Sequence, residues 1–211
     1  LYTWLAPQAH WVHPERGVPA SAIPDPAIDV GPYDVTHVGP AELTMTSPVS
    51  KTLGLQAVKT FRLLKDQPRL EFTVTLRNVA ATPARWAVWN LTAVRPVGTV
   101  FFQVPNGEAD LNFFGVADYQ RAFNDVLEII DDRWCAVEYR RYARAGAKLF
   151  VKVGSPFLAY RQPKVWFIRT FPADPRAIYT DQQSQIELWA DARQEKISEL
   201  QVTGPDCLIP P

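Results

Sequence analysis

The sequence predicts an all-β protein, a large antiparallel sandwich of about ten short strands. Apolar and polar residues alternate with a period of two in one segment after another, and Pro, Gly, Asn or Asp bound most of these segments. The chain has 19 Pro against 10 Gly and 12% aromatic residues, a composition that disfavours long helices and suits strands joined by turns. No long helical pattern separates the strands, which favours a sandwich or barrel.

The clearest strand covers residues 69–78, where four apolar side chains alternate with polar ones as in a strand with one solvated face. Segment 118–132 is compatible with a short amphipathic helix, or with a strand over Val126–Ile130. The other predicted strands are Leu43–Val49, Leu55–Leu64, Arg85–Val94, Thr99–Val104, Cys135–Tyr139, Lys148–Val153, Lys164–Phe171, Gln185–Ala190 and Ser198–Thr203.

The length of 211 residues suits a single β-sandwich domain over residues 1–211. Within it, residues 1–42 contain too many prolines for a long helix or a central strand, so they are expected to form loops. Bulky rings lie among these prolines, which is unusual for a linker. We therefore expect the segment to be ordered and packed on the sheet.

The balanced charge and the short apolar runs of the sequence argue against several classes of partner. The 22 Lys and Arg residues balance 22 Asp and Glu residues, so no positive field favours nucleic acid or an anionic membrane surface. No apolar run approaches the roughly 18 residues of a spanning helix, so no membrane span is expected. The two cysteines, Cys135 and Cys207, are too few for a disulfide framework and are interpreted as unlinked thiols.

The familiar catalytic motifs are absent, including a Gly-rich phosphate loop, GxSxG, HExxH and CxxC. His10 and His13 are spaced to share a metal only if their segment is helical, which Pro7 and Pro14 disfavour. No third ligand is indicated. The sequence therefore predicts neither a metal nor a cofactor site.

Seven tryptophans are a high number for a chain of 211 residues, and an indole ring can cover the apolar face of a sugar. In W-A-V-W-N the period of two places Trp86 and Trp89 on opposite faces, so at least one of them is expected to line a second surface, either another sheet or a cleft, and Trp89 is the candidate for facing a ligand. Glu187 and Glu199 occupy positions opposite the apolar residues of their strands. Such carboxylates lie either on a solvated face or in a ligand site.

Several segments, in order along most of the chain, resemble an uncharacterised bacterial family with the galactose-mutarotase-like supersandwich fold. They are Trp4–Gln8, Asp29–Tyr33, Leu43–Pro48, Gly54–Gln56, Leu76–Asn78, Trp86–Thr92 and Ser198–Pro211. The resemblance implies a large antiparallel sandwich whose concave face binds carbohydrate. It also implies that N-terminal strands are missing here, so that these strands or a partner chain would cover an exposed sheet edge. Members of this kind are often exported, which implies a periplasmic or extracellular location.

The resemblance also assigns roles to residues. In aldose mutarotases a glutamate near the C-terminus is the general base and a histidine in the central strand is the general acid. Glu199 takes the position of the base, but Asn90 lies in the strand that should carry the acid, and an amide is not a general acid. Classical mutarotase activity is therefore not expected from this strand.

Three functional hypotheses follow. The first is a carbohydrate-binding protein without mutarotase activity, whose cleft is formed by Trp89, Asn90, Glu187, Glu199, Trp4, His10 and His13. The second is an aldose 1-epimerase with Glu199 as base and His10 or His13 as acid. The third is a structural or interaction domain whose Trp-rich faces bind a partner.

Overall fold

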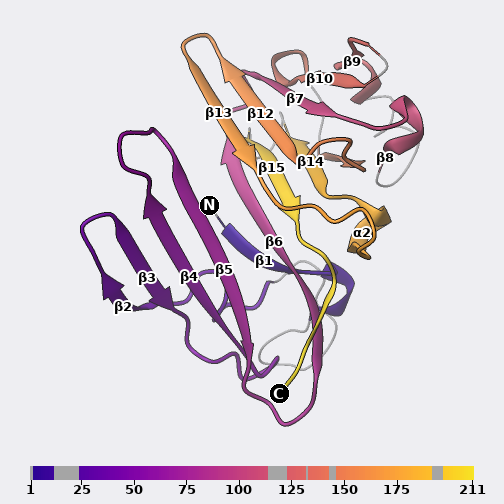
Figure 1. Ribbon diagram of the computed structural model, residues 1–211. Coiled ribbons are helices and arrows are strands. Elements are labelled where there is room, and N and C mark those ends of the chain that lie inside the picture. The colour runs from indigo at the N-terminus through magenta and orange to yellow at the C-terminus, as the bar shows by residue number, and fades with distance from the viewer. Residues whose placement is uncertain (1, 12–23, 114–122, 132, 143–145, 192–196) are drawn as a thin grey trace. The chain divides into compact units, whose positions relative to one another are not determined.

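The structure, a computed structural model, divides into two compact units (Figure 1). The sandwich unit comprises Trp89–Pro205, and the N-terminal unit comprises Tyr2–Val88 with Asp206–Pro211. Strand β6 (Ala84–Val94) passes from the N-terminal unit into the sandwich unit. The described residues are 2–11, 24–113, 123–131, 133–142, 146–191 and 197–211.

The N-terminal unit contains a four-stranded antiparallel sheet, in which each strand follows its predecessor in sequence. Its strands are β2 (Asp34–Val38), β3 (Glu42–Thr46), β4 (Leu55–Leu63) and β5 (Leu70–Asn78). Leu43, Phe61 and Phe72 lie in register across three strands and therefore share a face. The Phe61 and Phe72 rings stack with centroids 4.7 Å apart. The apolar residues that alternate with polar ones along each of these strands therefore lie together on one face of the sheet.

Strands from both ends of the chain neighbour strand β6. Strand β1 (Tyr2–Ala6) lies beside β6 in the strand order, and a 3-10 turn, η1 (Gln8–His10), follows it. Strand β16 (Cys207–Ile209) pairs antiparallel with β6. The pairing is supported by an ion pair of 2.6 Å between Arg85 and Asp206.

The sandwich unit is built from two antiparallel sheets. The β15 sheet runs in the order β6, β15 (Ile197–Thr203), β14 (Ile186–Asp191), β11 (Ala147–Val151) and β8 (Leu111–Phe113). The β7 sheet runs in the order β13 (Val165–Thr170), β12 (Phe157–Gln162), β7 (Thr99–Gln103), β10 (Trp134–Glu138) and β9 (Leu127–Ile129). The short elements are η2 (Gly107–Asp110), η3 (Tyr139–Arg141) and α2 (Thr180–Gln183).

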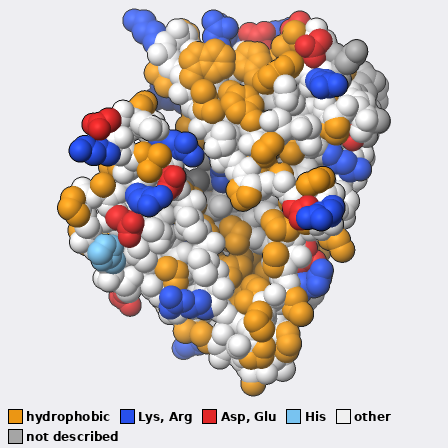
Figure 2. Space-filling model, in the orientation of Figure 1, with side chains coloured by type: hydrophobic (Ala, Val, Ile, Leu, Met, Phe, Trp, Pro, Cys, Tyr) orange, Lys and Arg blue, Asp and Glu red, His pale blue; other side chains and the backbone are white. Residues whose placement is uncertain are grey.

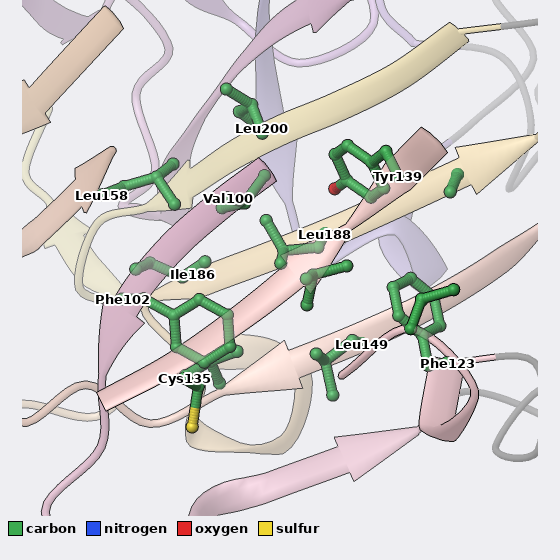
Figure 3. Close-up of a cluster of buried hydrophobic side chains, with 14 of the residues drawn as sticks. Val100, Phe102, Phe123, Cys135, Tyr139, Leu149, Leu158, Ile186, Leu188 and Leu200 are labelled. Atoms are coloured by element: carbon green, nitrogen blue, oxygen red, sulfur yellow. The ribbon is translucent and has the colours of Figure 1, made fainter. Parts of the chain in front are cut away.

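The core of the sandwich unit is formed by alternate residues of both sheets (Figure 3). Phe102 and Leu158 come from the β7 sheet, while Leu188 and Leu200 come from the β15 sheet, and all four are fully buried. Each such side chain contributes about 1.5–3 kcal/mol by leaving water. Because alternate residues of β14 and β15 point into this core, the residues between them occupy the opposite face of the β15 sheet.

The all-β prediction is confirmed, and every predicted strand has a counterpart. Strands β1, β2, β8, β12 and β16 were not predicted. Strands β1 and β2 lie in the proline-rich segment but contain no proline themselves, since Pro7 follows β1 and Pro32 precedes β2. Strand β12 was missed because Leu158–Tyr160 is buried at three successive positions and shows no alternation.

The segment 118–132 was left open between helix and strand. Residues 118–122 and 132 lie outside the described part, and Leu127–Ile129 forms strand β9. Both cysteines are free thiols, Cys135 in the core and Cys207 exposed. Among the described residues no helix has the length and apolar character needed to cross a membrane.

Candidate functional site

The face of the β15 sheet that points away from the core carries a group of polar and aromatic residues. Trp189 lies opposite Lys148 on one neighbouring strand and opposite Glu199 on the other. Residues opposite one another across strands share a face of the sheet. The polar face, as we name it, consists of Trp89, Lys148, Glu187, Trp189, Glu199, Gln201 and Thr203.

A buried ion pair lies at the centre of the polar face. Glu187 is 0% exposed, and its Oε2 lies 2.5 Å from Nζ of Lys148, whose side chain is 14% exposed. The Thr203 hydroxyl donates a hydrogen bond of 2.9 Å to the other oxygen, Oε1. The Lys148 ammonium also lies 4.3 Å from the centre of the Trp89 ring. A fully buried carboxylate is thus held by a cation and a hydroxyl, and the cation lies against an aromatic face.

Burial raises the pKa of Glu187 above its ordinary value, because the charged form loses its hydration. The positive charge of Lys148 is the largest opposing effect, and the negative charge of Asp181 raises the pKa further. A carboxyl group perturbed by burial and by a specific charged partner is a candidate for a functional site, although structural ion pairs show the same perturbation.

A chain of hydrogen bonds leads from the buried part of the polar face to Glu199. The indole Nε1 of Trp89 donates to Gln201 Oε1 at 3.1 Å, and Gln201 Nε2 donates to Glu199 Oε2 at 2.6 Å. Trp89 is 2% exposed and Gln201 is buried, whereas Glu199 is half-buried. The hydrogen bond from Gln201 therefore orients the carboxylate of Glu199, and the residue remains partly exposed to solvent.

Trp189 lies directly opposite Glu199 and is also half-buried. Gly146 approaches this ring closely, since a Cβ on Gly146 would lie 3.1 Å from Cζ2 of Trp189. A larger residue at position 146 would displace the ring. The polar face thus presents a carboxylate beside an indole, and the oxygen of one and the ring of the other are within reach of a single small ligand.

The turn before β14 has an unusual backbone. Asp181, Gln182 and Gln183 have φ angles of 49°, 65° and 61°, which non-glycine residues rarely adopt. Hydrogen bonds hold the turn, including one from the Ser184 hydroxyl to the Asp181 carbonyl at 2.7 Å. Such strain costs of the order of 1–3 kcal/mol per residue and is enriched at functional sites. Here it lies near Glu187, whose pKa responds to Asp181.

The structure brings three predicted site residues together. Trp89, Glu187 and Glu199 share the polar face, whereas the period of two had placed each glutamate only relative to the apolar residues of its own strand. Asn90 does not join them, because neighbouring residues of a strand point to opposite faces. It pairs with Val202 of the core side, and its carbonyl oxygen accepts a hydrogen bond from Arg169 at 3.3 Å.

The predicted residues of the first segment lie in the N-terminal unit. Trp4 contacts Trp11 edge to face at 5.6 Å, and His10 contacts Trp86 in the same manner at 5.9 Å. Both contacts are ring packing, whatever further role these residues have. His13 lies outside the described residues. Within the described ranges, no group of three or more His, Cys, Asp or Glu residues is arranged to hold a metal ion.

The N-terminal unit also contains a small pocket lined in part by Trp4, Trp11, Asp25 and Asp29. Burial raises the pKa of Asp29, while a hydrogen bond from Trp4 and the charge of Lys59 oppose the shift. Asp25 is engaged, since its Oδ2 accepts a hydrogen bond of 2.6 Å from the Ser50 hydroxyl. The pocket is small and Asp25 holds local structure, so the polar face is the stronger candidate.

Sequence reasoning missed four residues of the polar face. Trp189 and Gln201 could have been found, because each lies two positions from a predicted glutamate and so shares its face. Thr203 follows from the same period. Lys148 had no such signal, since a lysine in an alternating strand is normally solvated and its partner lies on a distant segment.

Fold and polar face define an all-β, sandwich-like protein with a buried ion pair beneath a partly accessible carboxylate. The chain belongs to the family described as "Domain of unknown function (DUF4380)", whose model matches residues 2–203. The expected membership of an uncharacterised family is thereby confirmed. No curated protein matches the chain.

The chain is also similar in fold to a TPR-domain containing protein from Parabacteroides distasonis. The TM-score is 0.53 at 14% sequence identity, and the match covers 99% of this chain and 35% of that protein. The chain therefore spans about a third of the protein that it matches. At this identity the likeness supports the fold alone.

Proposed function

We propose that the polar face binds a mono- or oligosaccharide, with Glu199 and Trp189 as the contact residues. The single observation that carries the proposal is a half-buried carboxylate directly opposite a half-buried indole on one sheet face. An indole covers the apolar C–H face of a pyranose, and a carboxylate accepts hydrogen bonds from its hydroxyl groups. The resemblance to the mutarotase-like supersandwich class is the reason for choosing a sugar, and a periplasmic or extracellular location belongs to the same proposal.

The proposal changes the role of Trp89. With 2% of its surface exposed, its ring has no face free for a sugar, and its N–H is bound to Gln201. We assign it to positioning, since it holds Gln201, which in turn orients Glu199. Trp189 takes the stacking role that sequence reasoning gave to Trp89.

Binding without ring opening is favoured over epimerase activity. Opening a pyranose requires one proton to leave the anomeric hydroxyl while another reaches the ring oxygen. Glu199 is the candidate base for the first step, but among the described residues no histidine lies on the polar face, and Lys148 is engaged by Glu187. The epimerase hypothesis remains the alternative that the test must separate.

The test is a titration of the protein with a panel of monosaccharides and oligosaccharides, followed by ligand-observed NMR and tryptophan fluorescence. We expect Trp189→Ala and Glu199→Gln each to weaken binding at least tenfold. The matched controls are Trp134→Ala and Glu138→Gln, since both residues are half-buried and lie on β10 of the other sheet. Binding that is absent across the panel, or lost equally in the controls, contradicts the proposal.

NMR exchange measurements on the same sugars separate the alternative. The proposal predicts no acceleration of anomer interconversion by the protein. Acceleration that disappears in Glu199→Gln would replace binding by epimerase activity, with Glu199 as its base.

A further inference from the structure

Strand β13, at the edge of the β7 sheet, exposes apolar side chains at four successive positions. Val165, Trp166, Phe167 and Ile168 are 60%, 54%, 38% and 57% exposed. Because successive side chains point to opposite faces, both faces of the strand are uncovered. Within the described residues β13 pairs only with β12, so its outer edge is also free.

The apolar surface continues from β13 onto the neighbouring strands. The Trp166 ring lies 5.7 Å from the Phe101 ring of β7, and the Arg161 guanidinium lies 5.6 Å above the Trp166 ring. Ile168 lies opposite Ala159, which lies opposite Phe101. Figure 2 shows apolar side chains gathered in this part of the sandwich unit.

Along residues 165–168 the edge lacks the features that normally prevent strand addition, and the inward-pointing charge of Arg169, which lies opposite the core residue Leu158, comes only after this run. Proteins protect exposed edges with inward-pointing charges, proline or a β-bulge. The register between β12 and β13 is continuous from Phe157 to Gln162, without a bulge. Lys164 and Arg169 flank the apolar run but do not interrupt it. The backbone groups of alternate residues are therefore presented along an edge that accepts another strand.

We propose that β13 pairs antiparallel with β13 of a second copy of this chain, which joins the two β7 sheets into one. Such a pair has a two-fold axis perpendicular to the sheet, so opposed residues must have numbers of the same parity. With the axis at Phe167, Trp166 lies opposite Ile168 of the second copy, and Phe167 lies opposite its own equivalent.

This register matches the chemistry of the strand. Aromatic and β-branched side chains are favourable cross-strand pairs. Lys164 lies opposite Thr170 and Val165 opposite Arg169, so no like charges meet. An axis at Ile168 would instead place Phe167 opposite Arg169, and an axis at Trp166 would place Ile168 opposite Lys164. The axis at Ile168 leaves a single apolar pair within the strand, and the axis at Trp166 pairs only residues 165–167 within it, whereas the axis at Phe167 pairs residues 165–169.

A second copy is favoured over a different partner because of what the edge requires. The added strand must offer apolar side chains at successive positions, on both of its faces. Among the described strands, β13 alone exposes four successive apolar residues. The other strand at a sheet edge with exposed residues throughout, β2, begins with Asp34 and carries Thr36 and His37 between its valines. The surface is thus complementary to itself.

Sedimentation velocity over a range of concentrations tests the assembly. We expect a species of twice the chain mass of 23.8 kDa, and a dissociation constant raised at least tenfold by Ile168→Lys. The matched control is Ile178→Lys, because Ile178 is equally exposed, at 57%, but lies outside β13. A chain that is monomeric at all concentrations, or an equal effect of both variants, overturns the proposal, including the case in which the patch binds another protein.

Cysteine cross-linking tests the register independently of any loss of assembly. Opposed Cα atoms in an antiparallel pair are about 4.5–5.5 Å apart, within the range of a disulfide. In a Cys207→Ser background, which removes the exposed native thiol, Phe167→Cys should form a covalent dimer on oxidation. Ile168→Cys should not, since its equivalents are about 8 Å apart. Cross-linking of Ile168→Cys alone overturns the register.

Discussion

Replacement of Lys148 by methionine tests whether the centre of the polar face is a coupled charge pair. Methionine keeps most of the volume beside Trp89 and removes only the cation, which leaves the carboxylate of Glu187 buried and unpaired. Removal of one partner of a buried ion pair typically costs about 3–5 kcal/mol. Because Thr203 still donates to Glu187 and the carboxyl can bind a proton, we expect a loss of about 3 kcal/mol at pH 8.

The loss should depend on pH with a defined sign. Burial holds the pKa of Glu187 above the value of 4.5 of an unperturbed glutamate, and loss of Lys148 raises it further. Between the pKa of Glu187 in the unfolded chain and its higher pKa in the folded protein, the folded state binds more protons than the unfolded chain. The free energy of unfolding therefore falls as pH rises through this range. The slope reaches at most about 1.4 kcal/mol per pH unit. The deficit of Lys148→Met should therefore be smaller at pH 5 than at pH 8.

Urea denaturation of the wild type and the variant at both pH values measures the effect. The double variant Lys148→Met/Glu187→Gln provides the control, because it removes both charges and should recover most of the loss. A single variant within about 1 kcal/mol of the wild type at pH 8 would refute the coupled pair. A deficit that is the same at both pH values would refute the proposed titration of Glu187.

Three further predictions concern the sandwich unit. Leu188→Ala removes a fully buried core side chain and should cost about 2–5 kcal/mol in chemical denaturation. Gly98→Ala would place a Cβ against the Arg161 carbonyl oxygen and 2.5 Å from the Tyr160 ring, so we expect a loss above about 2 kcal/mol and a lower melting temperature. Tyr139→Phe removes a buried hydroxyl that has no hydrogen-bond partner among the described residues, so its unfolding free energy should be unchanged or higher by up to about 1 kcal/mol.

The strands could be predicted where one face is buried and the other is not. Residues 70–78 show the period of two along their whole length, and the observed strand β5 has the predicted end. Strand β12 has no such signal, because the sandwich buries both of its faces at the central positions. Strand β16 is three residues long and depends on its pairing with β6, a contact that local sequence does not show.

The candidate site could be predicted in part for the same reason. Period two placed Glu187 and Glu199 away from the core, and the structure adds that they share one face with Trp89. Asn90 was included through the family resemblance, against the alternation that separates it from Trp89. The burial of Glu187 was also not predictable, because an alternating glutamate is normally solvated.

Stability alone does not account for the buried charges of the polar face. On the opposite face of the same strand, Ile186 and Leu188 fill their positions without any polar group, and apolar replacement of a buried ion pair is often neutral or stabilising. The pair becomes understandable as a support: Glu187 holds Lys148 against Trp89, whose N–H holds Gln201. Gln201 then fixes Glu199, and contact residues bind well only when their neighbours hold them in place. If the polar face binds sugar as proposed, the double variant Lys148→Met/Glu187→Gln should keep its stability and lose affinity for sugar, and unchanged affinity would refute this supporting role of the pair.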